Sequence, residues 1–162
     1  MTAGRAAARA ALALAALLCS FAGWTYAQTR GDEDLAHARA REAVLADATC
    51  RVAELTSFDA DAPGAARESW LRASTGALRE ELARAGAGTG PTARAHVTAA
   101  AVTALDRRAG TAELIATVEV ETRPEGEGAA HTERKRLEAL LDRTGGGWKP
   151  RSLAAVPVGG ER

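Results

Sequence analysis

The chain has 162 residues, with 21 basic and 21 acidic side chains and a formal net charge of zero. This balance provides no electrostatic footprint for nucleic acid, so we expect no nucleic acid among the partners. The length suits one small domain behind an N-terminal segment. Because only 4% of the residues are aromatic, the core must be built largely from small aliphatic side chains.

An uncharged and largely apolar stretch occupies residues 10–29. As a helix, its roughly 20 residues reach about 30 Å, the thickness of a hydrocarbon core. Arg5 and Arg9 precede the stretch and Trp24 lies near its other end, so the positive-inside rule keeps the N-terminus in the cytoplasm. We predict a short cytoplasmic N-terminus at residues 1–9 and a transmembrane signal-anchor helix at residues 10–29, which makes the lipid bilayer a partner.

Two alternatives stay open for this stretch. A cleavable signal peptide has the same layout, and residues 25–27 form a small-x-small cleavage motif. Against cleavage, the apolar run exceeds the usual roughly 7–15 residues, and bulky Trp24 lies close to the cut. A lipoprotein anchored at Cys19 would need a small residue where Leu18 stands. Each alternative places the following domain in an oxidising space outside the cytoplasm.

A long helix is predicted directly after the anchor, over residues 32–57. Arg39, Asp47, Glu54 and Cys50 fall on or near its polar side. Apolar residues at helical spacing form a stripe on the opposite side, which we expect to face the core. The stripe comprises Val44, Leu45, Ala48, Val52 and Leu55.

Two shorter helices are predicted next. The first covers residues 65–74, with Pro63 preset for its first turn. Thr75 and the glycine that follows it break this helix, and the second short helix covers residues 77–84. The glycine-rich segment at residues 86–91 is a loop that closes the helical part of the chain.

Alternating hydrophobicity after this loop predicts four antiparallel strands joined by hairpins. The strands are expected over residues 94–105, 112–121, 131–143 and 148–158. In the first strand, one face is expected to carry Ala95, Val97, Ala99, Ala101 and Leu105. Pro150 and Pro157 in the last strand favour an edge position or a bulge. Glu119 and Glu121 are expected to pair across the sheet with Arg134, Lys135 or Arg136.

Three helices followed by hairpin-linked strands define an α+β domain. We predict that the helices cover one face of a curved four-stranded antiparallel sheet, since the strands have only one consistently apolar side. This exported domain is expected over residues 30–158, with a C-terminal tail at residues 159–162.

The candidate acid–base residues are two histidines with three possible carboxylate partners. These are His96 and His131, with Asp59, Asp61 or Asp142. We interpret both histidines as surface residues, and His37 as a solvated residue of the juxtamembrane helix. Scattered histidines and a lone exported thiol offer no metal-ligand spacing, so no catalytic, cofactor-binding or metal-binding residue is assigned.

Other features have a structural interpretation beside a functional one. Trp70 and Trp148 are expected to anchor the helices on the sheet rather than to line a ligand site. Cys50 is expected to be unpaired, with a link between two chains as the alternative. The glycines at residues 145–147 lack the Lys-Ser/Thr that a phosphate loop needs. The apolar residues at 99–105 are expected either beneath the helices or in a partner contact.

The chain resembles a known family in four features. It has an N-terminal span, a long helix ending in Leu55-Thr-Ser-Phe-Asp59, a second element reaching Ser74-Thr-Gly-Ala-Leu-Arg79, and strands closing on Gly146-Gly-Trp148. In these features it is similar to the Mce-associated membrane proteins of actinobacteria. The resemblance implies a nuclear transport factor 2-like, ketosteroid isomerase-like cone fold. It also implies that subunits of mammalian-cell-entry (Mce) complexes, which carry lipids or sterols across the envelope, are the partners.

We therefore predict a non-enzymatic, single-pass accessory protein of the cell envelope that binds other envelope membrane proteins. One alternative is a small-molecule-binding or isomerase-like enzyme that uses the cone cavity. A second alternative is a structural homodimer that associates through the outer face of the sheet.

Overall fold

The computed structural model describes residues 3–86, 88–124 and 128–156. Among residues 3–33, side chains are described at residues 17–21 and 24, and the backbone throughout. Two compact units make up the chain, Met1–Arg39 and Ala40–Arg162. The predicted tail at residues 159–162 lies outside the described residues.

The N-terminal unit is formed by the first part of helix α1 (Ala3–Thr56). Its backbone stays helical through residues 10–29 and through Gly31. Four of the described side chains are large, apolar and 63–70% exposed: Leu17, Leu18, Phe21 and Trp24. In the described part of the chain, no helix combines the length and the apolar character needed to cross a membrane. Most side chains of the predicted span lie outside the described residues, and the span stays a prediction.

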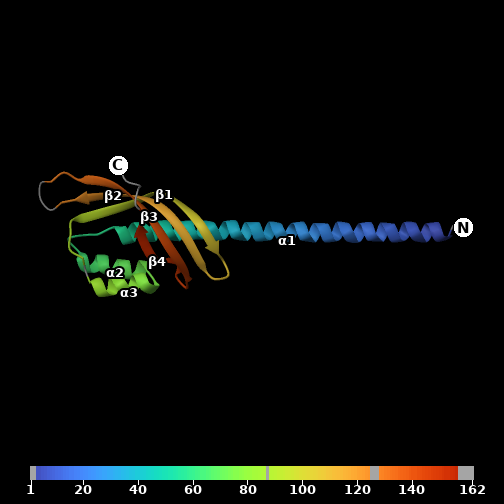
Figure 1. Ribbon diagram of the computed structural model, residues 1–162, viewed down its shortest axis with the longest axis horizontal. Helices are drawn as coiled ribbons and strands as arrows, with labels where there is room; N and C mark the ends of the chain where they lie inside the picture. The colour runs from blue at the N-terminus through green and yellow to red at the C-terminus, as the bar shows by residue number, and fades with distance from the viewer. Residues whose placement is uncertain (1–2, 87, 125–127, 157–162) are drawn as a thin grey trace. The chain divides into compact units, whose positions relative to one another are not determined.

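The second unit contains the rest of the secondary structure, in the predicted order of helices and then strands (Figure 1). After α1 come α2 (Pro63–Ala73), α3 (Gly76–Ala85), β1 (Thr92–Asp106), β2 (Thr111–Arg123), β3 (His131–Thr144) and β4 (Gly147–Ala155). The strands form one antiparallel sheet in the order β1-β2-β3-β4. The predicted α+β architecture, with helices packed on a four-stranded antiparallel sheet, is confirmed.

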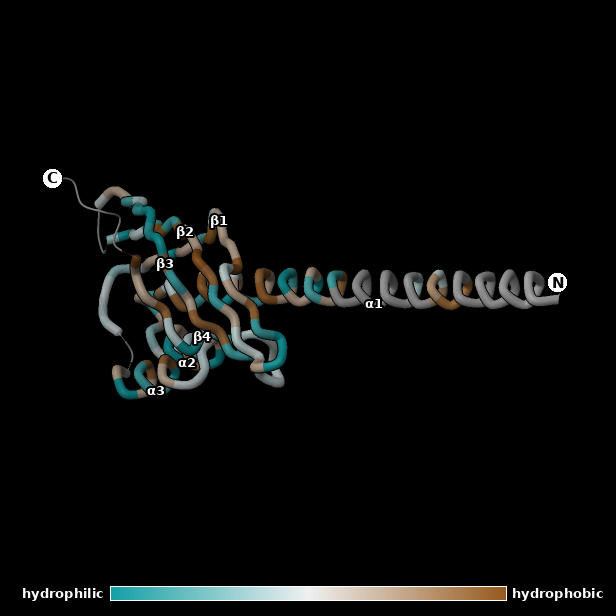
Figure 2. The backbone as a smooth tube through the Cα atoms, turned by 45° about the vertical axis from the view of Figure 1, so that its right-hand side comes forward, coloured by the Kyte–Doolittle hydropathy of each residue, from teal (hydrophilic) through white to brown (hydrophobic). Residues whose placement is uncertain are grey.

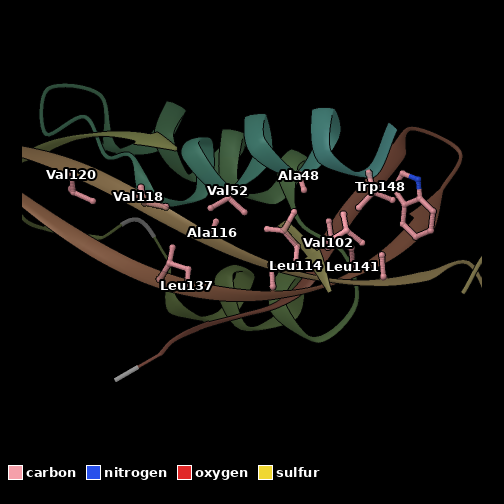
Figure 3. Packing of buried hydrophobic residues seen from close by; sticks show 13 residues of the cluster. Ala48, Val52, Val102, Leu114, Ala116, Val118, Val120, Leu137, Leu141 and Trp148 are labelled. Carbon is pink, nitrogen blue, oxygen red and sulfur yellow. The ribbon is translucent and has the colours of Figure 1, made fainter. Parts of the chain in front are cut away.

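The core lies between the C-terminal part of α1 and one face of the sheet. Val44, Ala48 and Val52 of α1 are fully buried, as their spacing predicted. Figure 3 shows Ala48 and Val52 on the side of the helix that faces the strands. From the sheet the core takes Val102, Ala112, Leu114, Ala116, Val118, Val120, Leu137, Ala139, Leu141 and Trp148. Each fully buried Val or Leu side chain stabilises the fold by roughly 1.5–3 kcal/mol.

Residues of β2 alternate strictly between this core and the opposite face of the sheet. Figure 2 shows the alternation as successive changes between hydrophobic and hydrophilic colours along the strands. On the outer face Glu119 lies opposite Arg134, and their side chains form an ion pair of 2.6 Å. The predicted cross-strand pairing is therefore confirmed for these two residues.

Strand β1 departs from the predicted alternation. Its register against β2 shifts between Val97 and Ala99 and again between Val102 and Ala104. Each shift is a β-bulge, which adds one residue to β1 and reverses the face on which the next residues lie. Ala100 and Val102 consequently pack on the core, whereas Ala99 and Ala101 are exposed. The expectation that Ala99 and Ala101 share one face with Ala95 and Val97 is wrong for this reason.

Helices α2 and α3 lie side by side next to β4 (Figure 1). The Thr75 N–H, between the two helices, donates to the Pro150 carbonyl at 2.9 Å. Pro150 is buried in β4, and β4 is an edge strand as the proline predicted. Pro157 lies outside the described residues.

The turn between β1 and β2 is closed by Asp106. Its carboxylate accepts hydrogen bonds from the N–H groups of Arg108 (2.8 Å) and Ala109 (2.9 Å). These bonds, first from Ala109 and then from Arg108, hold the pKa of Asp106 below its usual value. Gly110 follows with φ +69°, and its N–H donates to the Asp106 carbonyl. The predicted hairpin at residues 106–110 is confirmed.

Candidate functional site

A cleft of about 490 Å³ opens where the end of α1 meets α2, the start of β1 and the end of β2. Its volume lies within the range of small-ligand and peptide-side-chain pockets, roughly 300–1,000 Å³. Its walls combine aromatic, small and charged side chains. They comprise Glu54, Ser57, Phe58, Asp59, Ala60, Asp61, Ala66, Ser69, Trp70, Thr92, Ala93, Arg94, Arg123 and Pro124.

The segment after α1 is pinned against the start of β1, and this contact forms the floor of the cleft. Phe58 and Ala93 exchange two backbone hydrogen bonds of 2.8 Å, so Phe58 adds one bridge to the edge of the sheet. The Ser57 hydroxyl donates to the Ala53 carbonyl and accepts from the Ala95 N–H at 3.0 Å. This side chain therefore ends the helix and fixes the entry of the loop at the same time.

An aromatic pair forms one wall of the cleft. The rings of Phe58 and Trp70 are tilted by 31°, with centroids 5.8 Å apart. The Trp70 indole N–H donates to the Ser57 carbonyl at 2.9 Å, which holds the ring in place. Trp148 is buried in the core as predicted, but Trp70 is half-buried and lines the cleft. Trp70 thus packs on Phe58 at the wall of a cleft, and its interpretation as a packing residue rather than a ligand-site residue stays a prediction.

Charged side chains of both signs line the cleft. Glu54, Asp59 and Asp61 come from α1 and the loop that follows it. The Glu54 carboxylate accepts a short hydrogen bond from Ser69, and Asp59 accepts one from the Asp61 N–H at 3.0 Å. Among the described residues, none of the three carboxylates forms an ion pair with a basic side chain.

The two arginines of the cleft come from the strands. Arg123 forms an ion pair of 3.3 Å with Glu121, and Arg94 is the register partner of that same glutamate in the neighbouring strand. Glu121 thus offsets part of the positive charge of the arginines, whereas the three carboxylates have no such counter-ion in the described part of the chain. The cleft is consequently more negative than a simple count of its five charged residues indicates.

The structure brings together only part of the predicted acid–base set. Asp59 and Asp61 line the cleft, but His96 and His131 do not. His96 is exposed on β1 opposite Glu119, and His131 is exposed at the start of β3. Asp142 forms an ion pair of 3.2 Å with Arg151 on β4. The interpretation of His96 and His131 as surface residues is confirmed.

The remaining ionisable and sulfur-containing candidates are also exposed. His37 lies on the solvent side of α1 in the N-terminal unit. Cys50 is exposed on α1 in the second unit, and neither Cys50 nor Cys19 is in a disulfide. Within the described ranges, no three His, Cys, Asp or Glu side chains are grouped closely enough to hold a metal ion.

Sequence reasoning missed a polar contact between α1 and the turn joining β3 to β4. The Asp47 carboxylate accepts from the Trp148 N–H at 2.8 Å, and the Arg51 guanidinium donates to the Gly146 carbonyl at 2.8 Å. Asp47 and Glu54 were expected on or near the polar side of α1, but both side chains are half-buried. Asp47 is bonded to the Trp148 N–H, and Glu54 accepts a hydrogen bond from Ser69 of α2. The spacing of Asp47 and Arg51, one helical turn apart beside the apolar stripe, was the available signal.

The outer face of the sheet carries a second surface feature, which we call the outer-face patch. Its central row crosses the four strands as Ala101, Ile115, Glu138 and Ala154. Ile115 is 38% exposed, and Ala99, Ala101 and Ala104 are exposed beside it. The two bulges of β1 thus place alanines on the outer face that a regular strand would direct inwards.

Comparison with known proteins concerns the fold. No protein-family model matches the chain, and no curated protein matches it. Among solved structures, the chain is similar to CagV, a VirB8 homolog of the type IV secretion system of Helicobacter pylori. The TM-score is 0.58 at 10% sequence identity, and the match covers 72% of this chain and 98% of CagV.

A second similar structure is an IcmL-like type IV secretion system protein from Legionella pneumophila. It matches with a TM-score of 0.57 at 11% identity, over 75% of this chain and 96% of that protein. At such low identity the likeness establishes the fold alone. The second unit therefore has the nuclear transport factor 2-like α+β fold, which these secretion-system proteins share.

Proposed function

We propose that the chain is a non-enzymatic, single-pass envelope protein whose extracytoplasmic domain binds other subunits of a membrane transport complex. The observation that carries this proposal is the fold, because two proteins of type IV secretion systems have the same arrangement of helices and strands. The sequence resemblance to Mce-associated proteins favours the same general role.

The proposed anchor is the N-terminal part of α1, at residues 10–29. Its backbone is continuously helical, and Leu17, Leu18 and Trp24 are exposed where lipid would surround them. Exposed large apolar side chains on a helix are costly in water and favourable in a bilayer. The positive-inside rule then gives a cytoplasmic N-terminus and a domain outside the cytoplasm.

The partner proposed first is a multi-subunit envelope transporter. An Mce-type lipid importer is the complex that the sequence resemblance implies, and a secretion complex is the one that the solved structures suggest. In either complex, the proposed role is that of an anchored accessory domain that binds its partners without catalysing a reaction. The histidines, which lie away from the cleft, also favour a binding role over the isomerase-like alternative.

Affinity purification of the full-length tagged protein from native membranes, in mild detergent, tests this function. We expect membrane subunits of one transport complex at amounts comparable to the bait, identified by mass spectrometry. An unrelated single-span protein with the same tag serves as the control. Repeated recovery of the protein without any such subunit would contradict the proposal.

A second candidate function, a structural homodimer, is favoured by the outer-face patch. Its apolar centre around Ile115, surrounded by charged residues of both signs, has the composition of a protein interface. Ile115→Arg should convert a dimer to a monomer in sedimentation of the detergent-solubilised chain. A wild-type protein that sediments as a monomer would exclude this function.

A further inference from the structure

The cleft has walls that are fixed before any ligand arrives. Phe58 is held by two backbone bonds to Ala93, and the indole of Trp70 by its bond to the Ser57 carbonyl. A ligand that binds there loses little free energy to ordering the protein, since these rings already have their positions. The side chains of the cleft therefore define which ligand chemistry fits.

The aromatic pair and the unpaired carboxylates favour a cation. Phe58 and Trp70 present ring surfaces that attract a cationic group by about 0.5–2 kcal/mol in general. Asp59 and Asp61 are exposed beside them and, among the described residues, have no basic partner. By contrast, Arg123 of the cleft already has a counter-ion in Glu121.

The size of the cleft favours a side chain of a polypeptide over a bare ion. A volume of about 490 Å³ accommodates a long basic side chain together with an apolar neighbour. The stem of a lysine or arginine would lie along the two rings while its charge reaches the carboxylates. Small residues such as Ala60 and Ala66 leave room for the second side chain.

From these contacts we infer that the cleft is the docking site for a basic peptide segment of a partner protein. The inference deepens the proposed function and rests on it, since it names the surface and the chemistry through which the partner binds. The partner segment carries lysine or arginine beside an apolar residue. The stem of its basic side chain lies along Phe58 and Trp70 and its cation reaches Asp59 and Asp61. Its apolar side chain lies beside the small residues of the cleft.

Binding of short synthetic peptides to the full-length protein in detergent micelles tests the docking site directly. The probe is a capped, dye-labelled peptide with two lysines flanking a leucine, and fluorescence anisotropy is measured at low salt. We expect this peptide to bind at least about tenfold more tightly than the same peptide with glutamates in place of the lysines. Equal binding of the two, or tighter binding of the acidic peptide, would overturn the inference.

The double variant Asp59→Asn, Asp61→Asn removes both charges. The new side-chain amide at position 59 still has an oxygen that can accept the hydrogen bond from the backbone N–H of residue 61. The double variant should weaken binding of the basic peptide by about tenfold. The matched control is Glu80→Gln, Glu81→Gln, which changes the net charge equally at exposed residues of α3 that belong neither to the cleft nor to the outer-face patch. We expect this control to bind within about twofold of the wild type, and an equal loss in both variants would overturn the inference by showing a general charge effect.

The same two variants in the membrane purification separate the two proposals. If the wild type recovers transport subunits and the cleft variant recovers them equally, the docking site is wrong and the proposed function stands. If the wild type recovers no subunit, the proposed function fails, whatever the peptides do. Loss of the subunits in the cleft variant alone supports both.

Discussion

Asp47 is the residue that most clearly connects α1 to the far end of the sheet. Its carboxylate accepts a hydrogen bond from the Trp148 N–H, while Arg51 one turn later donates to the Gly146 carbonyl. Gly147 lies between them with φ +91°, and a Cβ atom there would come within 2.5 Å of an Asp47 carboxylate oxygen. The glycines at residues 145–147 thus allow a close approach of backbone to carboxylate, and Gly147 is the one that requires it.

Gly147→Ala should destabilise the protein by about 2 kcal/mol or more, because it combines an unfavourable φ with displacement of the Asp47 carboxylate. Urea unfolding of the full-length protein in detergent, followed by circular dichroism, measures the change. Gly145→Ala is the matched control, since a Cβ there has open space and its φ lies outside the left-handed region. Equal stability of the two variants would contradict the role given to Gly147.

Strand β1 is the element in which local sequence and tertiary structure disagree. Its middle is built from alanine, valine and threonine, which differ too little in polarity to mark one face. Two bulges then decide which residues face the core, and they place Ala100 inside and Ala99 outside. Neighbouring residues of the same type therefore have different structural roles.

Substitution by aspartate should distinguish these two alanines. Ala100→Asp puts a charge at a core contact and should lower the free energy of unfolding by about 2 kcal/mol or more. Ala99→Asp adds the same charge on the exposed face and should change it by no more than about 0.5 kcal/mol. Thermal unfolding followed by circular dichroism compares the two variants. A larger loss of stability for Ala99→Asp than for Ala100→Asp would contradict the position given to the first bulge.

The contrast between β2 and β1 explains how much of the fold could be predicted. The strict alternation of apolar and polar residues from Ala112 to Val120 is visible in the sequence, and so is the helical spacing of the buried stripe in α1. The bulges of β1 carry none, since an alanine run looks the same in either register. The cleft was also missed, because it depends on Phe58 returning to pair with Ala93, which no local pattern records.

At the scale of the whole molecule, one continuous helix belongs to both compact units. Its first part carries the proposed anchor, and its last part supplies Val44, Ala48 and Val52 to the core of the second unit. The two cysteines lie in different units, Cys19 in the predicted span and Cys50 in the folded domain, and both thiols are free. They are therefore natural reporters of topology.

A membrane-impermeant maleimide added to intact cells whose outer layers it can penetrate should label Cys50 and leave Cys19 unmodified. In the proposed topology, lipid surrounds Cys19 and Cys50 is outside the cytoplasm. Mass spectrometry of the recovered protein gives the labelled site, with Cys50→Ser as the control. Detergent should make both thiols reactive. A mature protein that lacks Cys19 would indicate cleavage of a signal peptide instead.

The pairing of Phe58 with Ala93 has a consequence for contacts between copies of the chain. Together with the bond from Arg41 to the Val102 carbonyl and that from Thr75 to Pro150, it engages backbone groups at both margins of the sheet. Sheets whose edge groups are engaged in this way are less prone to join edge to edge. At high local density, copies of the domain should therefore resist pairing through these edges.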